Sequence, residues 1–189
     1  YPNNYIKKLD LALRFLPRPA DYLFLYFIGF YILLLVLKVD LKLAALGALA
    51  FGFSTYLIII LGVGHNSKAH AIAYMPLVLS GILLTFRKHY IIGFLLTTLA
   101  LALELVANHP QMTYYLMLLV LVLGIAYIID AYKKQELPHF FKSVGILVFA
   151  VVLAVGLNAT GFLATQEYAK ESTRGQSELT INPDGSPKE

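Results

Sequence analysis

The chain has 189 residues, of which 59% are hydrophobic and only 14% are charged, and its formal net charge is +4. A soluble domain carries roughly a quarter charged residues, so the composition excludes an ordinary soluble protein. The basic residues stand in short segments beside long apolar runs, which excludes nucleic acid as a partner. Since the chain has no cysteine, a disulfide framework, a thiol nucleophile and a cysteine metal site are also excluded.

Residues 1–20 predict a short amphipathic helix followed by a linker. One helical face carries Ile6, Leu9, Leu13 and Leu16, and the other carries mostly Lys7, Lys8, Asp10 and Arg14. Pro17 and Pro19 then end the helix. Such a helix suits the membrane interface on the outer face, and the alternative is an ordinary amphipathic helix packed on protein.

Residues 21–165 predict an all-α, polytopic transmembrane helical bundle, because apolar runs long enough to cross about 30 Å of hydrocarbon recur there. The six predicted spans cover residues 21–37, 41–63, 71–86, 91–107, 113–129 and 143–165. Asp21 is placed to cap the first span. The third and fourth spans are short and Pro76 lies early in the third, so they are expected to tilt, kink or be shielded by neighbours.

Two further features complete the predicted organisation. In the second span, Ala44, Ala48 and Gly52 recur every four residues, which predicts a structural face that another helix approaches closely. Residues 166–189 predict a polar segment on the outer face that leads into a further region, as in a fragment of a longer protein.

The loops between six spans alternate between two sides of a membrane. One side has Lys38, Lys42, Arg87, Lys88, Lys133, Lys134 and Lys142, whereas the short loops of the other side have Lys68 alone. By the positive-inside rule the first side is cytoplasmic. The loops GHNSKAH (residues 64–70) and NHPQ (residues 108–111) therefore lie on the outer face, where the polar groups that suit chemistry are concentrated.

Glu104 is the strongest candidate for a catalytic residue. An acid among leucines near the end of the fourth span is costly unless it is paired, protonated or next to a polar cavity. A functional Glu104 is a general base, an acceptor for sugar hydroxyls or a metal ligand. The structural alternative is a partner for a polar group at a helix end.

The other candidates form a predicted binding region on the outer face. His65, His70 and His109 join Glu104 as a possible site for a divalent metal, although their spacing is not diagnostic, and they are alternatively donors to a phosphate. Lys68 pairs with a lipid phosphate or sits at the headgroups as an interfacial lysine. The polar candidates are Asn66, Asn108, Gln111 and Arg174, while Asn158 is expected to bond between helices.

Three stretches of the chain resemble the bacterial YfhO-like membrane proteins. They are residues 45–84 (ALGALAFGFSTYLIIILGVGHNSKAHAIAYMPLVLSGILL), 103–121 (LELVANHPQMTYYLMLLVL) and 161–180 (GFLATQEYAKESTRGQSELT). The similarity extends over essentially the whole chain. YfhO-like proteins are placed with the GT-C class of glycosyltransferases, so the resemblance implies a GT-C-like fold in the bacterial inner membrane.

The resemblance also implies a reaction and its partners. GT-C enzymes take a sugar from a polyprenyl-phosphate carrier and attach it to an envelope glycan or lipid acceptor at the outer face. Their usual catalytic acid is in a first large outer loop, which by resemblance lies upstream of Tyr1, so this chain is expected to supply part of the cavity and the carrier-phosphate site. The competing interpretations are a transporter or flippase of lipids or envelope precursors, and a non-catalytic envelope assembly protein.

Overall fold

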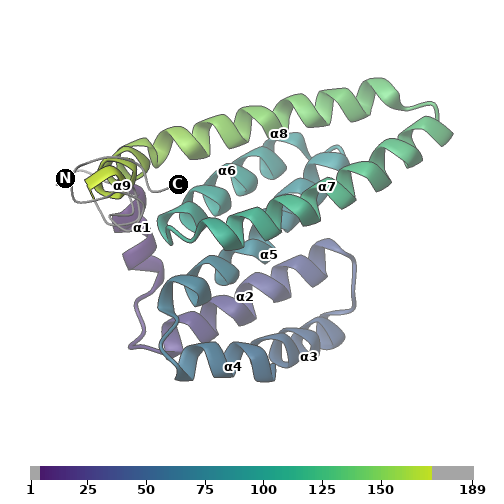
Figure 1. Ribbon diagram of the computed structural model, residues 1–189. Coiled ribbons are helices and arrows are strands. Elements are labelled where there is room, and N and C mark those ends of the chain that lie inside the picture. Colours follow the sequence, from purple (N-terminus) through teal and green to yellow (C-terminus); the bar gives the residue numbers. More distant parts are fainter. Residues whose placement is uncertain (1–4, 172–189) are drawn as a thin grey trace, which may run out of the picture.

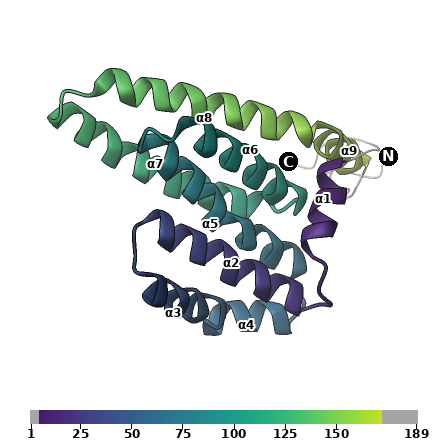
Figure 2. The same cartoon turned by 180° about the vertical axis from the view of Figure 1, so that it is seen from behind.

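The computed structural model describes residues 5–171, and within them every regular element is an α-helix (Figure 1). The helices are α1 (Tyr5–Leu13), α2 (Ala20–Val36), α3 (Leu41–Gly52), α4 (Thr55–Gly62), α5 (Asn66–Phe86), α6 (Tyr90–Val106), α7 (Pro110–Lys133), α8 (Leu137–Leu157) and α9 (Ala159–Glu171). Short turns make successive long helices antiparallel, and α1 and α9 lie at the same end of the bundle (Figure 2). The all-α prediction is confirmed.

The turns that reverse the chain share one backbone feature, a residue with a left-handed conformation. The second residue after the end of α2, α4, α5, α6 and α7 has a positive φ: Lys38, Gly64, Lys88, Asn108 and Gln135. A left-handed residue at this position lets the next amide groups bond back to the last turn of the helix, as the Lys88 and His89 amides do with the carbonyls of Thr85 and Leu84. Each helix is thereby followed at once by an antiparallel neighbour.

Helix α5 is the centre of the bundle and makes its most extensive contacts with α6 and α2. Glycine permits the close approach of α5 and α6: a Cβ atom on Gly81 would lie 2.3 Å from Oγ1 of Thr97, and one on Gly93 would lie 2.3 Å from Oγ1 of Thr85. Since real Cβ atoms do not approach this closely, the two helices touch through their backbones at both places.

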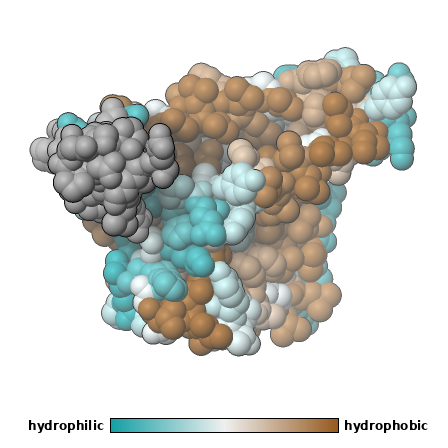
Figure 3. Space-filling model, in the orientation of Figure 1, coloured by the Kyte–Doolittle hydropathy of each residue, from teal (hydrophilic) through white to brown (hydrophobic). Residues whose placement is uncertain are grey.

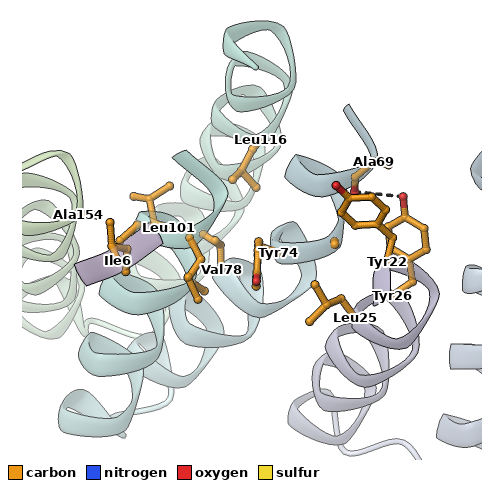
Figure 4. Packing of buried hydrophobic residues seen from close by; sticks show 14 of the residues in the cluster. Ile6, Tyr22, Leu25, Tyr26, Ala69, Tyr74, Val78, Leu101, Leu116 and Ala154 are labelled. Carbon is orange, nitrogen blue, oxygen red and sulfur yellow. Dashed lines mark hydrogen bonds between the residues drawn. The ribbon is translucent and has the colours of Figure 1, made fainter. Parts of the chain in front are cut away.

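The hydrophobic core lies on both sides of α5. Tyr74 and Val78 of α5 stand between Leu25 of α2 and Leu101 of α6 (Figure 4). On the α2 side, the Tyr26 hydroxyl donates a hydrogen bond of 3.1 Å to the carbonyl of Ala69, the dashed line in Figure 4. This bond satisfies a buried phenol and fixes α2 to the first turn of α5.

The small-residue face predicted for the second span is confirmed. Ala44, Ala48 and Gly52 are buried, and α3 packs against α2. A Cβ atom on Gly52 would lie 2.4 Å from the ring of Phe27, so no larger residue fits there without movement.

Two of the predicted spans are not continuous helices. The second span bends by 42° between α3 and α4, where Phe53 and Ser54 are not helical. The sixth span starts earlier, at Leu137, and breaks at Asn158 between α8 and α9. The Asn158 amide donates to the carbonyls of Ala102 and Ala154, and such side-chain bonds to backbone compete with a regular helix.

The third and fifth spans are longer than predicted. Helix α5 begins at Asn66, so residues 66–70 of the predicted loop form its first turn, because the left-handed Gly64 ends α4 abruptly. Pro76 lies inside α5 without ending it. Helix α7 covers Pro110–Lys133, with Pro110 at its first position, where the missing amide hydrogen is not needed.

Helices α5, α7 and α8 are long and apolar enough to cross a membrane, and the bent α3–α4 pair is a fourth candidate. Helices α2 and α6 have 17 residues each, which gives about 25 Å of length against about 30 Å of hydrocarbon. Apolar side chains cover the outside of α7 and α8 (Figure 3). Several apolar helices thus fit a multi-pass membrane protein, and about six spans stays a prediction.

Helix α1 packs on the protein, and its place at the membrane interface stays a prediction. Its buried residues are Ile6 and Asp10, whereas Leu9 and Leu13 of the predicted apolar face are 40% and 38% exposed. The buried face of α1 is therefore rotated by part of a helical turn from the predicted face. The reason is that Asp10 forms hydrogen bonds inside the bundle. Asp21 is also buried and does not cap α2, whose N-cap position is Pro19.

The turns gather at two opposite ends of the bundle. At the basic end, defined by residues 36–42, 86–90 and 130–142, Lys88 pairs with Glu136 at 3.0 Å and the Arg87 guanidinium donates to the carbonyl of Val36. At the polar end, defined by residues 5–14, 63–70, 104–113 and 158–168, Asp10 bonds His70 and Asn108 bonds Thr165. The loops assigned by sequence to opposite sides thus lie at opposite ends, and which end faces outward stays a prediction.

Candidate functional site

Glu104 lies in the last turn of α6 with no exposed surface. The NHPQ turn reverses the chain, and the first turn of α7 returns beside it. There the Thr113 hydroxyl lies 3.0 Å from Oε1 and 3.2 Å from Oε2 of Glu104. A neutral hydroxyl compensates little of the cost of burying a carboxylate, so Glu104 occupies a position that packing alone does not favour.

A hollow of about 320 Å³ opens in front of Thr113. Its lining residues are Leu105, Asn108, His109, Pro110, Thr113, Tyr114, Met117 and Phe162. Nδ1 of His109 is buried and has no hydrogen-bond partner within the described part of the chain. Unsatisfied buried nitrogens are uncommon, so His109 is an unusual residue in the lining of this hollow.

Asn108 connects this hollow with a neighbouring one of about 270 Å³, which Lys7, Asn158 and Thr165 also line. The Asn108 amide donates to Oγ1 of Thr165 at 3.2 Å, which holds the middle of α9 against the turn. Asn158 bonds the carbonyl of Ala102 at 2.9 Å, and the predicted bond between helices is confirmed. Two adjoining hollows, the first lined mainly by apolar surface and the second by polar and apolar surface alike, therefore share Asn108 at the polar end.

Of the predicted residues, the structure brings Glu104, Asn108 and His109 together around the Thr113 hollow. Gln111 is exposed and donates to the Tyr115 hydroxyl at 2.8 Å, along its own helix. Thr113 was missed, although its position nine residues after Glu104, just beyond a proline turn, was a usable signal.

The residues of the GHNSKAH segment lie apart from this hollow. His65 and Asn66 are exposed, and Lys68 lies over the ring of Tyr56, with its Nζ 5.9 Å from the ring centroid. His70 is buried and bonds Asp10 instead. Just after the segment, Ala71 packs against Ala107 and Met112 of the α6–α7 turn, while Arg174 lies outside the described residues.

The predicted metal site is not formed by the described residues, among which no three or more His, Cys, Asp or Glu side chains gather in a way that holds a metal. His70 bonds Asp10, whereas Glu104 bonds Thr113. The histidines were predicted together because their loops share one side, but the α5 turn and the α6–α7 turn direct them to different partners.

The chain matches no family model, no curated protein and no solved structure. The likeness to YfhO-like proteins accordingly stays a prediction.

A second polar cluster, centred on Asp10, was missed as a unit. Oδ1 of Asp10 lies 2.6 Å from Nε2 of His70 and accepts from the Tyr74 hydroxyl at 2.9 Å, while Oδ2 accepts from Arg14 at 2.7 Å. Arg14 also reaches Asp21 at 3.4 Å. Because the partner residues of Asp10 stand 60 and 64 positions away, no local pattern joins them.

The electrostatics of this cluster favour an ionised Asp10. Burial alone would raise the pKa of this carboxyl, but the hydrogen bonds from His70 and Arg14 outweigh burial and hold the pKa below its ordinary value of 3.8. Every oxygen of Asp10 is occupied by donors from its own chain. The hydrogen bonds of this Asp10 cluster therefore join α1 to α5.

Proposed function

We propose that this chain forms part of a glycosyltransferase of the bacterial inner membrane, with a GT-C-like bundle of about six spans. It transfers a sugar from a polyprenyl-phosphate carrier to an envelope glycan or lipid acceptor at the outer face. The observation that carries the proposal is the buried Glu104, which holds the hydroxyl of Thr113 at the wall of a hollow at the polar end. The resemblance to YfhO-like proteins adds to it.

In the proposed reaction, an oxygen of the acceptor forms a bond to the anomeric carbon while the bond from that carbon to the carrier phosphate breaks. The phosphate leaves with the electron pair of the broken bond. The proton of the acceptor hydroxyl moves to Thr113, whose own proton passes to Glu104, since Thr113 stands between Glu104 and the hollow. Glu104 thus acts through Thr113 and is a positioning residue.

The rest of the hollow supplies polar groups of the kind that a sugar phosphate needs. Asn108 offers an amide, and the side chain of His109 lies in the lining of the hollow. Below the hollow, the outside of α7 exposes Leu118, Leu121 and Val122, a surface suited to the polyprenyl chain. His65, Asn66 and Lys68 are left to contact lipid headgroups at the same end.

A flippase for lipids or envelope precursors is the second candidate, and one observation favours it. An apolar hollow of about 260 Å³ shares Thr113 and Met117 with the first hollow and extends to Thr97 in the middle of α6. Such a continuation suits passage of a lipid through the bundle. A flippase moves its substrate without breaking a bond, so detection of a transferred sugar separates the two functions.

The test is transfer of radiolabelled sugar from polyprenyl phosphate to membrane acceptors by the full protein. Glu104→Gln is expected to lower transfer at least about a hundredfold, the usual scale for one acid–base group, while the melting temperature changes little. Glu167→Gln is the matched control, because Glu167 is exposed at the same end of the bundle.

Substitutions of Thr113 provide a second test, with an outcome that a purely structural role of Glu104 would not produce. Thr113→Ser keeps the hydroxyl and is expected to retain transfer, whereas Thr113→Val is expected to lose it as Glu104→Gln does. Equal transfer by the wild-type protein and Glu104→Gln would remove Glu104 from the proposal. Movement of the carrier lipid with no transferred sugar would establish the flippase instead.

A further inference from the structure

A polar hollow of about 360 Å³ lies at the basic end, on the opposite side of the bundle from Glu104. It is bounded by the α5–α6 turn and the α7–α8 turn. Its charged lining residues are Arg87, Lys88, Asp130, Lys134 and Glu136, and its floor is formed by Phe86, Tyr127 and Phe140. The proposed transfer reaction makes no use of this hollow.

The wall of the hollow is held in place by His139. Its Nε2 lies 2.8 Å from the carbonyl of Phe86, which can only accept, so Nε2 carries the hydrogen. Its Nδ1 then accepts from the Tyr90 hydroxyl at 2.8 Å. Since Phe86 also stacks on Tyr127 with 4.1 Å between ring centroids, the floor and wall are fixed before any ligand enters.

The charged side chains that line the hollow have a net positive charge. Lys88 pairs with Glu136 at 3.0 Å, and Lys134 pairs with Asp130 at 2.8 Å. The Arg87 guanidinium donates to the carbonyl of Val36 and forms no ion pair within the described part of the chain. Three cations against two carboxylates give a net charge of +1, which matches the single negative charge of a phosphodiester.

The surroundings of the hollow suit a lipid. Large apolar side chains near it are exposed, with Ile91 at 76%, Phe141 at 61% and Ile129 at 49%. Lys142 lies over the ring of Tyr90, with 4.4 Å to the ring centroid, as basic and aromatic side chains do at headgroup level. A ligand with a phosphate at the hollow and acyl chains along these side chains would cover both kinds of surface.

We propose that this hollow binds the phosphodiester headgroup of an anionic phospholipid, with the phosphate on Arg87 and the rim formed by Lys88 and Lys134. Basic pockets between the ends of membrane helices are suited to anionic headgroups. A zwitterionic lipid has the same phosphate but adds a cation, which the net positive charge of the hollow disfavours. The site is independent of the proposed sugar transfer.

The test uses the full chain in nanodiscs that contain equal parts of phosphatidylglycerol and phosphatidylcholine. Native mass spectrometry measures which lipid stays bound when the protein is released. The wild-type protein is expected to retain phosphatidylglycerol, and Arg87→Gln is expected to lower its retention about fivefold, the scale of one basic residue at an anionic surface. Lys42→Gln is the matched control: Lys42 is an exposed cation at the same end but outside the hollow.

A second variant keeps the proposal testable if Arg87→Gln fails to fold. Lys134 is 61% exposed in its side chain, so Lys134→Gln is expected to fold and to lower retention in the same direction. Equal retention in Lys134→Gln and Lys42→Gln, or equal retention of the two lipids by the wild-type protein, would overturn the proposal. A third measurement adds inorganic phosphate to the protein in detergent. A rise in the melting temperature with phosphate but not with phosphatidylglycerol would assign the hollow to a soluble anion instead.

Discussion

Asp10 holds the first helix of the chain to the centre of the bundle. Its carboxylate receives Arg14 from its own helix and both His70 and Tyr74 from α5, and it is 1% exposed. A buried ion pair contributes little net stability when it forms, but removing one partner is costly because the other charge is left uncompensated. Asp10 is therefore expected to be sensitive to substitution.

Asp10→Asn is expected to lower the stability of the protein by about 3–5 kcal/mol at neutral pH. The pKa of Asp10 in the folded protein lies below its ordinary value of 3.8, so the charged form stabilises the fold at pH values above 3.8. That contribution is lost as the pH falls below 3.8 and through the lower folded pKa. Melting temperatures of the two proteins in detergent across this range are expected to converge.

The control for this pH dependence is Asp130→Asn, because the Asp130 side chain is 52% exposed and pairs with a lysine at the surface. Its melting temperature is expected to follow that of the wild-type protein throughout. A constant difference between the wild-type protein and Asp10→Asn down to the lowest pH would show that the charge of Asp10 does not stabilise the fold.

Single residues were predictable where their surroundings in the sequence were unusual. Glu104 stands out because leucines flank it, and the structure places it behind Thr113, which lines a hollow with Asn108 and His109. Asp10 does not stand out, because it lies among charged residues in an amphipathic segment. Its burial depends on α5, which no pattern within residues 1–20 can indicate.

The helices pack most closely where small residues from two elements face each other. Gly81 and Thr85 of α5 meet Thr97 and Gly93 of α6 in a reciprocal arrangement, in which each glycine lies against a threonine of the other helix. This contact combines close backbone approach with β-branched side chains that have few rotamers. It positions α6, and with it Glu104, against the central helix.

Gly81→Ala is expected to destabilise the protein by about 1–3 kcal/mol, because the added methyl group would lie 2.6 Å from the backbone nitrogen of Thr97. Gly145→Ala in α8 is the matched control: its Cβ atom would meet nothing within 4 Å, so a neutral or slightly stabilising effect is expected. Thermal unfolding in detergent measures both. Equal melting temperatures for the two variants would contradict the close contact of α5 and α6.

The existence of the helices was more predictable than their ends. Apolar runs identified every long helix. The small-residue face formed by Ala44, Ala48 and Gly52 was predicted from their spacing alone. The helix ends depend on residues with a left-handed conformation. Three of these are Lys38, Lys88 and Gln135, which the sequence does not mark because they are not glycine. The break at Asn158 depends on a carbonyl of α6, which the local sequence does not show.

At the scale of the whole molecule, polar and charged groups separate to two ends with apolar helix surfaces between them (Figure 3). The polar end carries the Thr113 hollow and the Asp10 cluster, and the basic end carries the proposed lipid site. This division agrees with the distribution of lysine and arginine along the sequence, from which the two sides were predicted. The proposed chemistry requires the polar end to face outward.

Labelling of single cysteines tests this requirement most directly, since the chain has no cysteine of its own. Ser67 is exposed at the polar end and Gln135 is exposed at the basic end. With a membrane-impermeant maleimide on intact cells, Ser67→Cys is expected to react at once, and Gln135→Cys is expected to react only after permeabilisation. Reaction of both variants from the same side would contradict a membrane-crossing bundle with its site at the outer face.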